Sequence, residues 1–278
     1  MTSKSGKHII FKSVFGRDSS GPILAACLNS IPGVTGEEPI RDIEILNPFR
    51  YGEKLKDRVG ILDIAAKDST GRLYHIETQA DHDRMFVQRV SWYHARIHGE
   101  QLSQGDDFSL LRKTTSVLVT VQALFPDGER VHSRFGSREW DDGFVLNDLR
   151  ELHFLELPKF HGDDVKRLSC SLDRWLHLLK FGVKYATIEV EVPAELLSEE
   201  GMEMALNAYR KSLADREVLN MLHFREKAEL MEATKLALAR EEGRAEVAAR
   251  MKELGLDREL IKKATGLSDK ELDSLTTE

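Results

Sequence analysis

Residues 60–79 read GILDIAAKDSTGRLYHIETQ, and this stretch decides the fold expected for the chain. Apolar, β-branched and aromatic residues fill both of its halves, and a polar break at residues 68–71 separates them. This pattern is typical of two strands joined by a tight turn. If the glycine that ends the break closes a three-residue hairpin loop in the left-handed conformation, the register pairs Asp63 with Glu77.

Side-chain alternation along the two strands extends this pair into a polar face. Asp63 and Lys67 on the first strand point the same way as His75, Glu77 and Gln79 on the second. Opposed carboxylates lie ~4.5–5.5 Å apart and repel each other unless a cation separates them. Mg²⁺ or Mn²⁺ suits such oxygen ligands and completes its shell with water and phosphate oxygens. We therefore expect Asp63 and Glu77 to bind the metal and Gln79 to orient water or phosphate during phosphodiester hydrolysis.

The hairpin resembles the core of PD-(D/E)XK nucleases, and more closely the recombination-promoting nuclease and putative transposase family. The family motif corresponds to Leu62–Ile64, Asp68, Gly71 and Ile76–Gln79, with weaker matches at Phe11–Gly16 and Thr265–Ser268. The resemblance implies an α/β fold with a restriction-endonuclease-like αβββαβ core and a mostly helical C-terminal region. It also implies double-stranded DNA as the substrate, in a setting of DNA recombination or a mobile element.

The chain departs from the superfamily pattern in two places. Gln79 stands where the superfamily has a lysine, and the helix expected at Pro22–Ile31 contains no acid of the kind that many members contribute. Lys67 is a candidate for the missing positive charge and Glu44 for the missing acid, while the resemblance favours a role for Arg89. In the alternative interpretation, Lys67 and Glu44 are solvated strand residues and Arg89 is a surface arginine in a salt bridge.

Three further segments belong to the expected core, and an additional strand and helix follow them. Residues 42–46 alternate as a strand before the hairpin, and Phe86, Val90, Tyr93 and Ile97 form a helical apolar stripe after it. Residues 116–125 are a near-continuous apolar run, typical of a buried central strand. We expect an additional strand at residues 152–157 and a helix at residues 163–179.

Composition predicts a globular cytoplasmic protein without a membrane segment. Two cysteines among 278 residues cannot form a disulfide framework or a four-cysteine zinc site. No apolar run approaches the ~18–20 residues that cross a bilayer, and no signal-peptide pattern is present. The formal net charge is −7, but acids and bases nearly balance in residues 1–135. The lack of a broad basic stripe favours transient contact with DNA.

A change of composition divides the chain into two expected domains. From Ser198 onward Ala, Leu, Glu, Lys and Arg dominate and proline is absent, which predicts long helices to about Leu254. We therefore expect a nuclease domain at residues 1–193, including the additional strand and helix, and a helical region at residues 194–278.

Two short helices are expected at residues 256–276. Gly255 is predicted to end the long helical region, one short helix follows Asp257, and Ser268 with Glu271 forms the capping box of the next. This arrangement predicts either a helix-turn-helix with a DNA role or, because acids outnumber bases there, a packing or oligomerisation module.

The preferred interpretation is a Mg²⁺-dependent endodeoxyribonuclease, and two other interpretations stay open. The chain could instead be a catalytically weak or inactive regulatory protein that binds DNA or a protein on the same fold, since Gln79 replaces a lysine. The C-terminal helices could also form a homodimer that brings two active faces onto opposite strands.

Overall fold

The computed structural model describes residues 4–36, 38–46, 64–79, 85–187 and 189–274. The chain divides into two compact units, Met1–Leu222 and His223–Glu278. The first unit contains a six-stranded sheet of order β1-β2-β3-β4-β6-β5. The strands are β1 (Ile43–Leu46), β2 (Ile64–Asp68), β3 (Leu73–Gln79), β4 (Thr114–Thr120), β5 (His132–Arg138) and β6 (Val145–Glu156).

The β2–β3 hairpin has the register predicted from the sequence. Ile64 pairs with Ile76, and Ala65 pairs with His75. The turn is closed by a hydrogen bond from Asp68 N to Arg72 O at 3.1 Å, and Gly71 has φ +89°. Glycine is suited to this turn because positive φ costs it no steric strain.

The mixed strand directions follow from the connections. The β1–β2 and β2–β3 pairs are antiparallel, whereas the β3–β4 and β4–β6 pairs are parallel. The parallel β3–β4 pair requires a crossover, which α3 (Phe86–Gly99) supplies. The order αβββαβ of the restriction-endonuclease-like core, expected from the resemblance, is thus confirmed within an α/β fold.

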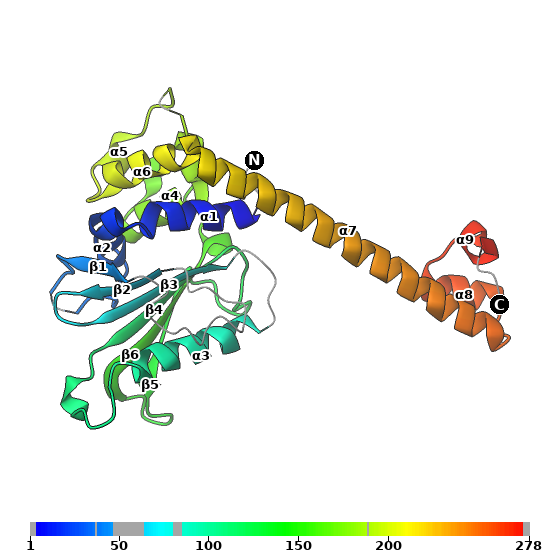
Figure 1. Cartoon of the computed structure of the whole chain (residues 1–278), viewed down its shortest axis with the longest axis horizontal. Helices are drawn as coiled ribbons and strands as arrows, with labels where there is room; N and C mark the ends of the chain where they lie inside the picture. The colour runs from blue at the N-terminus through cyan, green and yellow to red at the C-terminus, as the bar shows by residue number, and fades with distance from the viewer. Residues whose placement is uncertain (1–3, 37, 47–63, 80–84, 188, 275–278) are drawn as a thin grey trace. The chain divides into compact units, whose positions relative to one another are not determined.

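Helices cover both faces of the sheet (Figure 1). On one face lie α1 (Lys4–Phe15), α2 (Gly21–Asn29), α4 (Ser171–Phe181) and α6 (Met202–Ala214), which enclose the large core around Trp175. The other face is covered by α3, whose predicted stripe of Phe86, Val90, Tyr93 and Ile97 is buried. The polar face of the hairpin points toward α3, because Leu73 packs with Tyr93 and Ile97.

Several element boundaries differ from those expected. β4 ends at Thr120 and not at residue 125, and β6 begins at residue 145 because it pairs with β5, an edge strand that the sequence pattern did not reveal. α1 is a helix that the sequence pattern did not reveal. The helix expected at residues 163–179 is a 3-10 turn at Val165–Arg167 followed by α4.

The remaining helices form the predicted helical C-terminal region. α5 (Ala194–Leu197) and α6 lie beyond residue 193 but belong to the first compact unit, in which Ser212 Oγ donates to Ser13 Oγ at 2.8 Å. α7 (Arg216–Glu253) is followed by α8 (Arg258–Thr265) and α9 (Asp269–Ser274). Within the described ranges, no helix combines the length and apolarity needed to span a membrane.

Candidate functional site

Glu77 lies near the carboxyl end of β3, on the face covered by α3. Its side chain is buried, and Arg89 of α3 donates from its guanidinium to Glu77 Oε1 at 3.0 Å. His75 lies two residues earlier on the same face, with Nε2 3.6 Å from Glu77 Oε2. The structure therefore brings a carboxylate, a guanidinium and an imidazole together at one point of the sheet.

A hydroxyl on the neighbouring strand connects His75 to α3. Ser116 of β4 lies beside His75 in the parallel register. Its Oγ is 3.4 Å from His75 Nδ1 and 2.8 Å from Nδ1 of His94, and all three side chains are buried. Glu77, His75, Ser116 and His94 thus form one continuous polar row.

The two histidines of α3 add no positive charge to this interface. Burial, followed by the nearby His75, Arg150 and His98, lowers the pKa of His94 to about 4. Burial and then Arg150 lower the pKa of His98. Both α3 histidines are consequently neutral near pH 7, and they bond the hydroxyls of Ser116 and Thr114. The four-residue spacing of His94 and His98 places both rings on the side of α3 that packs against β4.

Of the three predicted catalytic residues, Asp63 is not described and Gln79 is placed only by its backbone. Asp63 lies outside the described residues, so its pairing with Glu77 stays a prediction. Gln79 is the last residue of β3, and its backbone is paired with Thr120 of β4. Its role in orienting water or phosphate also stays a prediction.

The two substitute residues considered from the sequence lie at the turn end of the hairpin. Glu44 of β1 is paired directly with Lys67 of β2, and Lys67 is paired with Leu73. Leu73 is four residues from Glu77 along β3, a separation of about 13 Å at the usual rise per strand residue. The register does not bring Lys67 or Glu44 to Glu77.

Asp68, the second acid of the family-like motif, organises the turn. Oδ1 accepts bonds from the backbone and hydroxyl of Thr70 at 2.9 and 2.7 Å and from Arg72 N at 3.0 Å. Oδ2 accepts from Arg72 Nε at 2.6 Å and from Tyr74 OH at 2.9 Å. Burial acts to raise the pKa of Asp68, but these hydrogen bonds outweigh it and lower the pKa. The residue is a buried anchor for the hairpin.

Glu77 offers the donor chemistry that a hard divalent cation requires. A carboxylate has about four acceptor sites, so it can accept from an arginine and still coordinate a cation. Mg²⁺ is commonly bound by one or two carboxylates and keeps several waters. No cluster of three or more His, Cys, Asp or Glu suited to a metal is found in the described ranges. Glu77 fits a sparse, water-rich Mg²⁺ or Mn²⁺ site, and it does not fit a closed zinc site.

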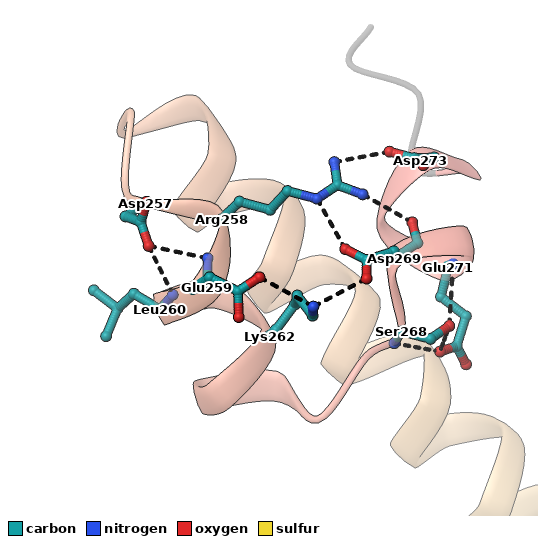
Figure 2. Close-up of polar contacts among 9 residues, drawn as sticks. All are labelled: Asp257, Arg258, Glu259, Leu260, Lys262, Ser268, Asp269, Glu271 and Asp273. Atoms are coloured by element: carbon teal, nitrogen blue, oxygen red, sulfur yellow. Dashed lines mark hydrogen bonds and ion pairs between the residues drawn. The ribbon is translucent and has the colours of Figure 1, made fainter.

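The second unit carries a different kind of candidate site, formed by α8 and α9 (Figure 2). Asp257 caps α8 by accepting from the backbone amides of Glu259 and Leu260 at 3.0 and 3.2 Å. Ser268 and Glu271 form the predicted capping box: Ser268 N donates to Glu271 Oε2 at 2.6 Å, and Glu271 N donates to Ser268 Oγ at 3.4 Å. Gly255 and Gly266 have positive φ after α7 and α8, as C-cap glycines do.

Basic residues of α8 are engaged by acids of α9 (Figure 2). Arg258 contacts Asp269 at 3.1 Å and Asp273 at 2.8 Å, and Lys262 contacts Asp269 at 2.9 Å. Ala248, Ile261, Leu267 and Leu272 form the small core beneath these pairs. The predicted two short helices and their turn are therefore present as a packed helical unit.

Comparison with known proteins covers both units. A family model described as PD-(D/E)XK nuclease family transposase matches residues 8–239. A second, described as Rpn/YhgA-like nuclease family, C-terminal HTH domain, matches residues 241–277. No curated protein and no solved structure matches the chain.

Proposed function

The chain belongs to the PD-(D/E)XK nuclease family transposases, and from this premise we propose that it is a Mg²⁺- or Mn²⁺-dependent endodeoxyribonuclease. Membership gives the chain a nuclease- or transposase-like role, and nucleases of this superfamily generally use divalent metal ions. The proposal of metal-dependent DNA cleavage rests on one observation: the Glu77 carboxylate is buried on the hairpin face, where Arg89 donates a hydrogen bond to it.

In this proposal Asp63 and Glu77 hold the metal ion. The ion supplies polarisation of the phosphoryl group and a lowered pKa for a bound water. Glu77 is presented by a central strand and fixed by Arg89, so its oxygens are pre-oriented. Gln79, at the end of the same strand, orients the water or a phosphate oxygen.

Double-stranded DNA is the proposed substrate. The C-terminal HTH match suggests DNA binding. The pairing of Arg258 and Lys262 with acids of α9 reduces the positive charge available to phosphates. Contact through this unit is therefore transient in the proposal. A link to DNA recombination or a mobile element, and a cytoplasmic location, remain predictions.

Plasmid cleavage by the purified chain tests the nuclease directly. The wild type is expected to nick or linearise supercoiled DNA with Mg²⁺ or Mn²⁺ and to be inactive with Ca²⁺. Glu77→Gln and Asp63→Asn are expected to lose more than about 100-fold in rate, because each removes a charged metal ligand. Glu38→Gln, at an exposed position of the first unit, is the matched control and should cleave normally.

The outcomes separate the proposal from contamination and from the competing function. Equal cleavage by all variants would indicate a contaminating nuclease or a misplaced site. No cleavage by a folded wild type would favour the catalytically weak DNA- or protein-binding regulator, which Gln79 in place of lysine already supports. That regulator would bind its partner without metal, and Asp63→Asn would leave the binding unchanged.

We also propose that the second unit forms a homodimer. Phe224, Met231 and Leu238 recur at seven-residue intervals along α7, and their exposed fractions are 77%, 53% and 53%. An apolar residue at one fixed position of each seven-residue repeat lies at the contact between helices that pack side by side. A second copy of the same helix, which carries the same repeat, is the proposed occupant of this stripe.

A further inference from the structure

Arg150 of β6 carries a positive charge that no carboxylate neutralises within the described part of the chain. Its side chain is exposed, and no hydrogen bond or ion pair to its guanidinium is found in those ranges. The next residue, Glu151, points to the opposite face of the strand, where it pairs with Lys113 and Arg134. An exposed guanidinium of this kind can bind an anion from outside the chain.

The parallel pairing of β4 with β6 places Arg150 near a histidine of α3. Arg150 is paired with Thr114, so the two side chains lie on the same face of the sheet. Thr114 Oγ1 lies 2.9 Å from His98 Nδ1, which identifies this face as the one that α3 covers. His98 is only partly buried. A guanidinium and an imidazole, both in contact with solvent, therefore lie next to each other at the edge of α3.

Hydrogen bonds determine which ring nitrogen of His98 carries the proton. The backbone N–H of Arg112 donates to Oε1 of Gln101 at 3.0 Å, and this bond orients the Gln101 amide. The amide nitrogen donates to Arg112 O at 2.9 Å and lies 3.1 Å from Thr114 Oγ1 and 3.2 Å from His98 Nδ1. An N–H directed at Nδ1 requires a lone pair there, so a neutral His98 carries its proton on Nε2. Nε2 is on the far side of the ring from Thr114.

The electrostatics around Arg150 favour a bound anion. Burial and then Arg150 lower the pKa of His98. Burial, followed by His75, Arg150 and His98, lowers the pKa of His94 to about 4. Part of both shifts is the repulsion between the Arg150 guanidinium and a proton added to either ring. An anion bound beside Arg150 would offset this repulsion, because it attracts both positive charges.

We propose that Arg150 and His98 form a phosphate-binding site between α3 and β6. The planar guanidinium binds phosphate oxygens through its parallel N–H groups, and His98 Nε2–H donates to the same phosphate. Glu77 is two strands away in the sheet and four residues further along, about 10 Å across and about 13 Å along the strands. The site is therefore separate from the proposed metal site and does not rest on the proposed function.

Two sources can supply the phosphate group. One is the backbone of DNA that lies across the α3 side of the sheet, and the other is free phosphate or a small phosphorylated molecule. Both sources present the same oxygens to Arg150 and His98, so the experiment uses a probe for each.

Nitrogen-15 NMR of histidine-labelled full-length protein, titrated with inorganic phosphate at pH 7 and constant ionic strength, tests the site. The wild type is expected to show a saturable shift of His98 Nε2, and His98→Phe assigns that signal. Arg150→Gln should weaken binding by about 10–100-fold, as expected for loss of a charged hydrogen bond. Arg150→Lys keeps the charge but loses the planar donor pair, so its affinity should be intermediate. Arg130→Gln removes another exposed arginine of the same unit and is the matched control.

Phosphorus-31 NMR gives a readout that does not depend on the His98 signal. The wild type is expected to broaden the line of inorganic phosphate. His98→Phe keeps an aromatic ring but removes the N–H donor, so it should reduce the broadening, as should Arg150→Gln. Thermal melting of each variant checks that the fold is retained. If His98→Phe does not fold, Arg150→Gln decides, because Arg150 is exposed and pairs in the sheet through its backbone.

A short DNA duplex without divalent metal separates the two sources. A shift of His98 that is lost in Arg150→Gln would assign the phosphate to the DNA backbone. A response to inorganic phosphate alone would assign it to free phosphate or a small phosphorylated molecule, and both results support the site. An unperturbed His98 with both probes, or equal binding by the wild type and Arg150→Gln, would overturn the proposal. So would an equal loss in Arg130→Gln, and each result holds whether or not the protein cleaves DNA.

Discussion

Glu77 is the residue at which separate parts of the fold meet. It comes from β3, its guanidinium partner from α3, and the hydroxyl that lies beside its neighbour His75 from β4. Burial of the carboxylate makes these partners necessary, because an unpaired buried charge is costly. The nearby Asp68 shows the contrasting use of a buried acid: it bonds only its own hairpin.

Replacing Asp68 is expected to destabilise the fold without changing the face of the sheet that carries Glu77. Asp68→Ala removes five hydrogen bonds, one of them part of the ion pair with Arg72, from a side chain that is only 3% exposed. The free energy of unfolding should fall by about 3 kcal/mol, as for other broken buried pairs. Urea denaturation measures this change. Asp127→Asn, in an exposed turn, is the control and should change stability by less than about 0.5 kcal/mol.

Stability should decline in mild acid because of a buried histidine pair. His132 Nε2 lies 3.0 Å from His153 Nδ1, and burial, then His153 and Arg134, lower the pKa of His132 to about 4. The unfolded chain therefore binds more protons than the folded one, so stability is complete above about pH 6.5 and is lost as pH falls toward 4. Melting temperatures between pH 7.5 and 4.5 measure the slope.

Replacing His132 should make the melting temperature less dependent on pH. His132→Asn is expected to reduce the fall in melting temperature between pH 6.5 and 4.5, whereas His161→Asn, at an exposed position, should leave it unchanged. An unaltered slope in His132→Asn would assign the acid sensitivity to other groups. One such group is His94, whose pKa burial, followed by His75, Arg150 and His98, lowers to about 4. Glu151 acts at lower pH: burial acts to raise its pKa, but His153, Arg134 and Lys113 outweigh burial and lower it to about 2. Its contribution is lost only below about pH 4.5.

At the scale of elements, caps decide where the short C-terminal helices begin. α9 has six residues, too few for intrinsic helix stability, so its start depends on the Ser268–Glu271 box and its position on the buried Leu272. The Arg258 and Lys262 pairs in Figure 2 add little because they are exposed.

Ser268→Ala should therefore loosen α9 selectively. The loss of an N-cap costs about 1 kcal/mol, roughly a fivefold decrease in protection of the helix amides from hydrogen exchange. The amide of Leu272, which bonds Ser268 O at 3.0 Å, is the probe. Lys270→Ala, on the same helix and exposed, is the control. Equal protection of Leu272 in both variants would mean that packing alone sets the start of α9.

At the scale of the whole molecule, charge and apolar exposure are unevenly distributed. Acids and bases nearly balance in residues 1–135, so the net charge of −7 arises mainly in the remainder of the chain. The exposed apolar residues of α7 belong to that remainder. α7 itself holds eight basic and eight acidic residues, so its exposed apolar stripe, and not its charge, suits it to contact between protein chains.

The proposed homodimer predicts a specific response to charge on α7. Met231→Lys places a charge within the seven-residue stripe and should convert dimer to monomer in light scattering after gel filtration. Leu236→Lys is the matched control, since Leu236 is 52% exposed but lies outside the stripe. A monomeric wild type, or equal dissociation by both variants, would contradict this interface.

The sequence by itself determined the elements that depend on residues close to one another in the chain. The β2–β3 register followed from a glycine turn and alternation, and the α3 stripe and the α9 capping box followed from residues within about three helical turns of each other. Glu77 was predicted because period-two alternation places it on the polar face. His75 lies on that face too, yet its partner Ser116 is 41 residues away in sequence.

Only the tertiary structure decided which groups meet Glu77 and how the sheet is completed. The parallel β3–β4 register sets Ser116 beside His75, and packing of α3 carries Arg89 to Glu77. Edge strand β5, part-polar and irregularly paired, lacks the alternation that marks a strand in sequence. The physical reason is that parallel strand pairing and helix packing bring together segments that are distant in the sequence. Hydrophobic burial drives both, but it requires only that a residue lie inside the protein and does not specify which residue it contacts.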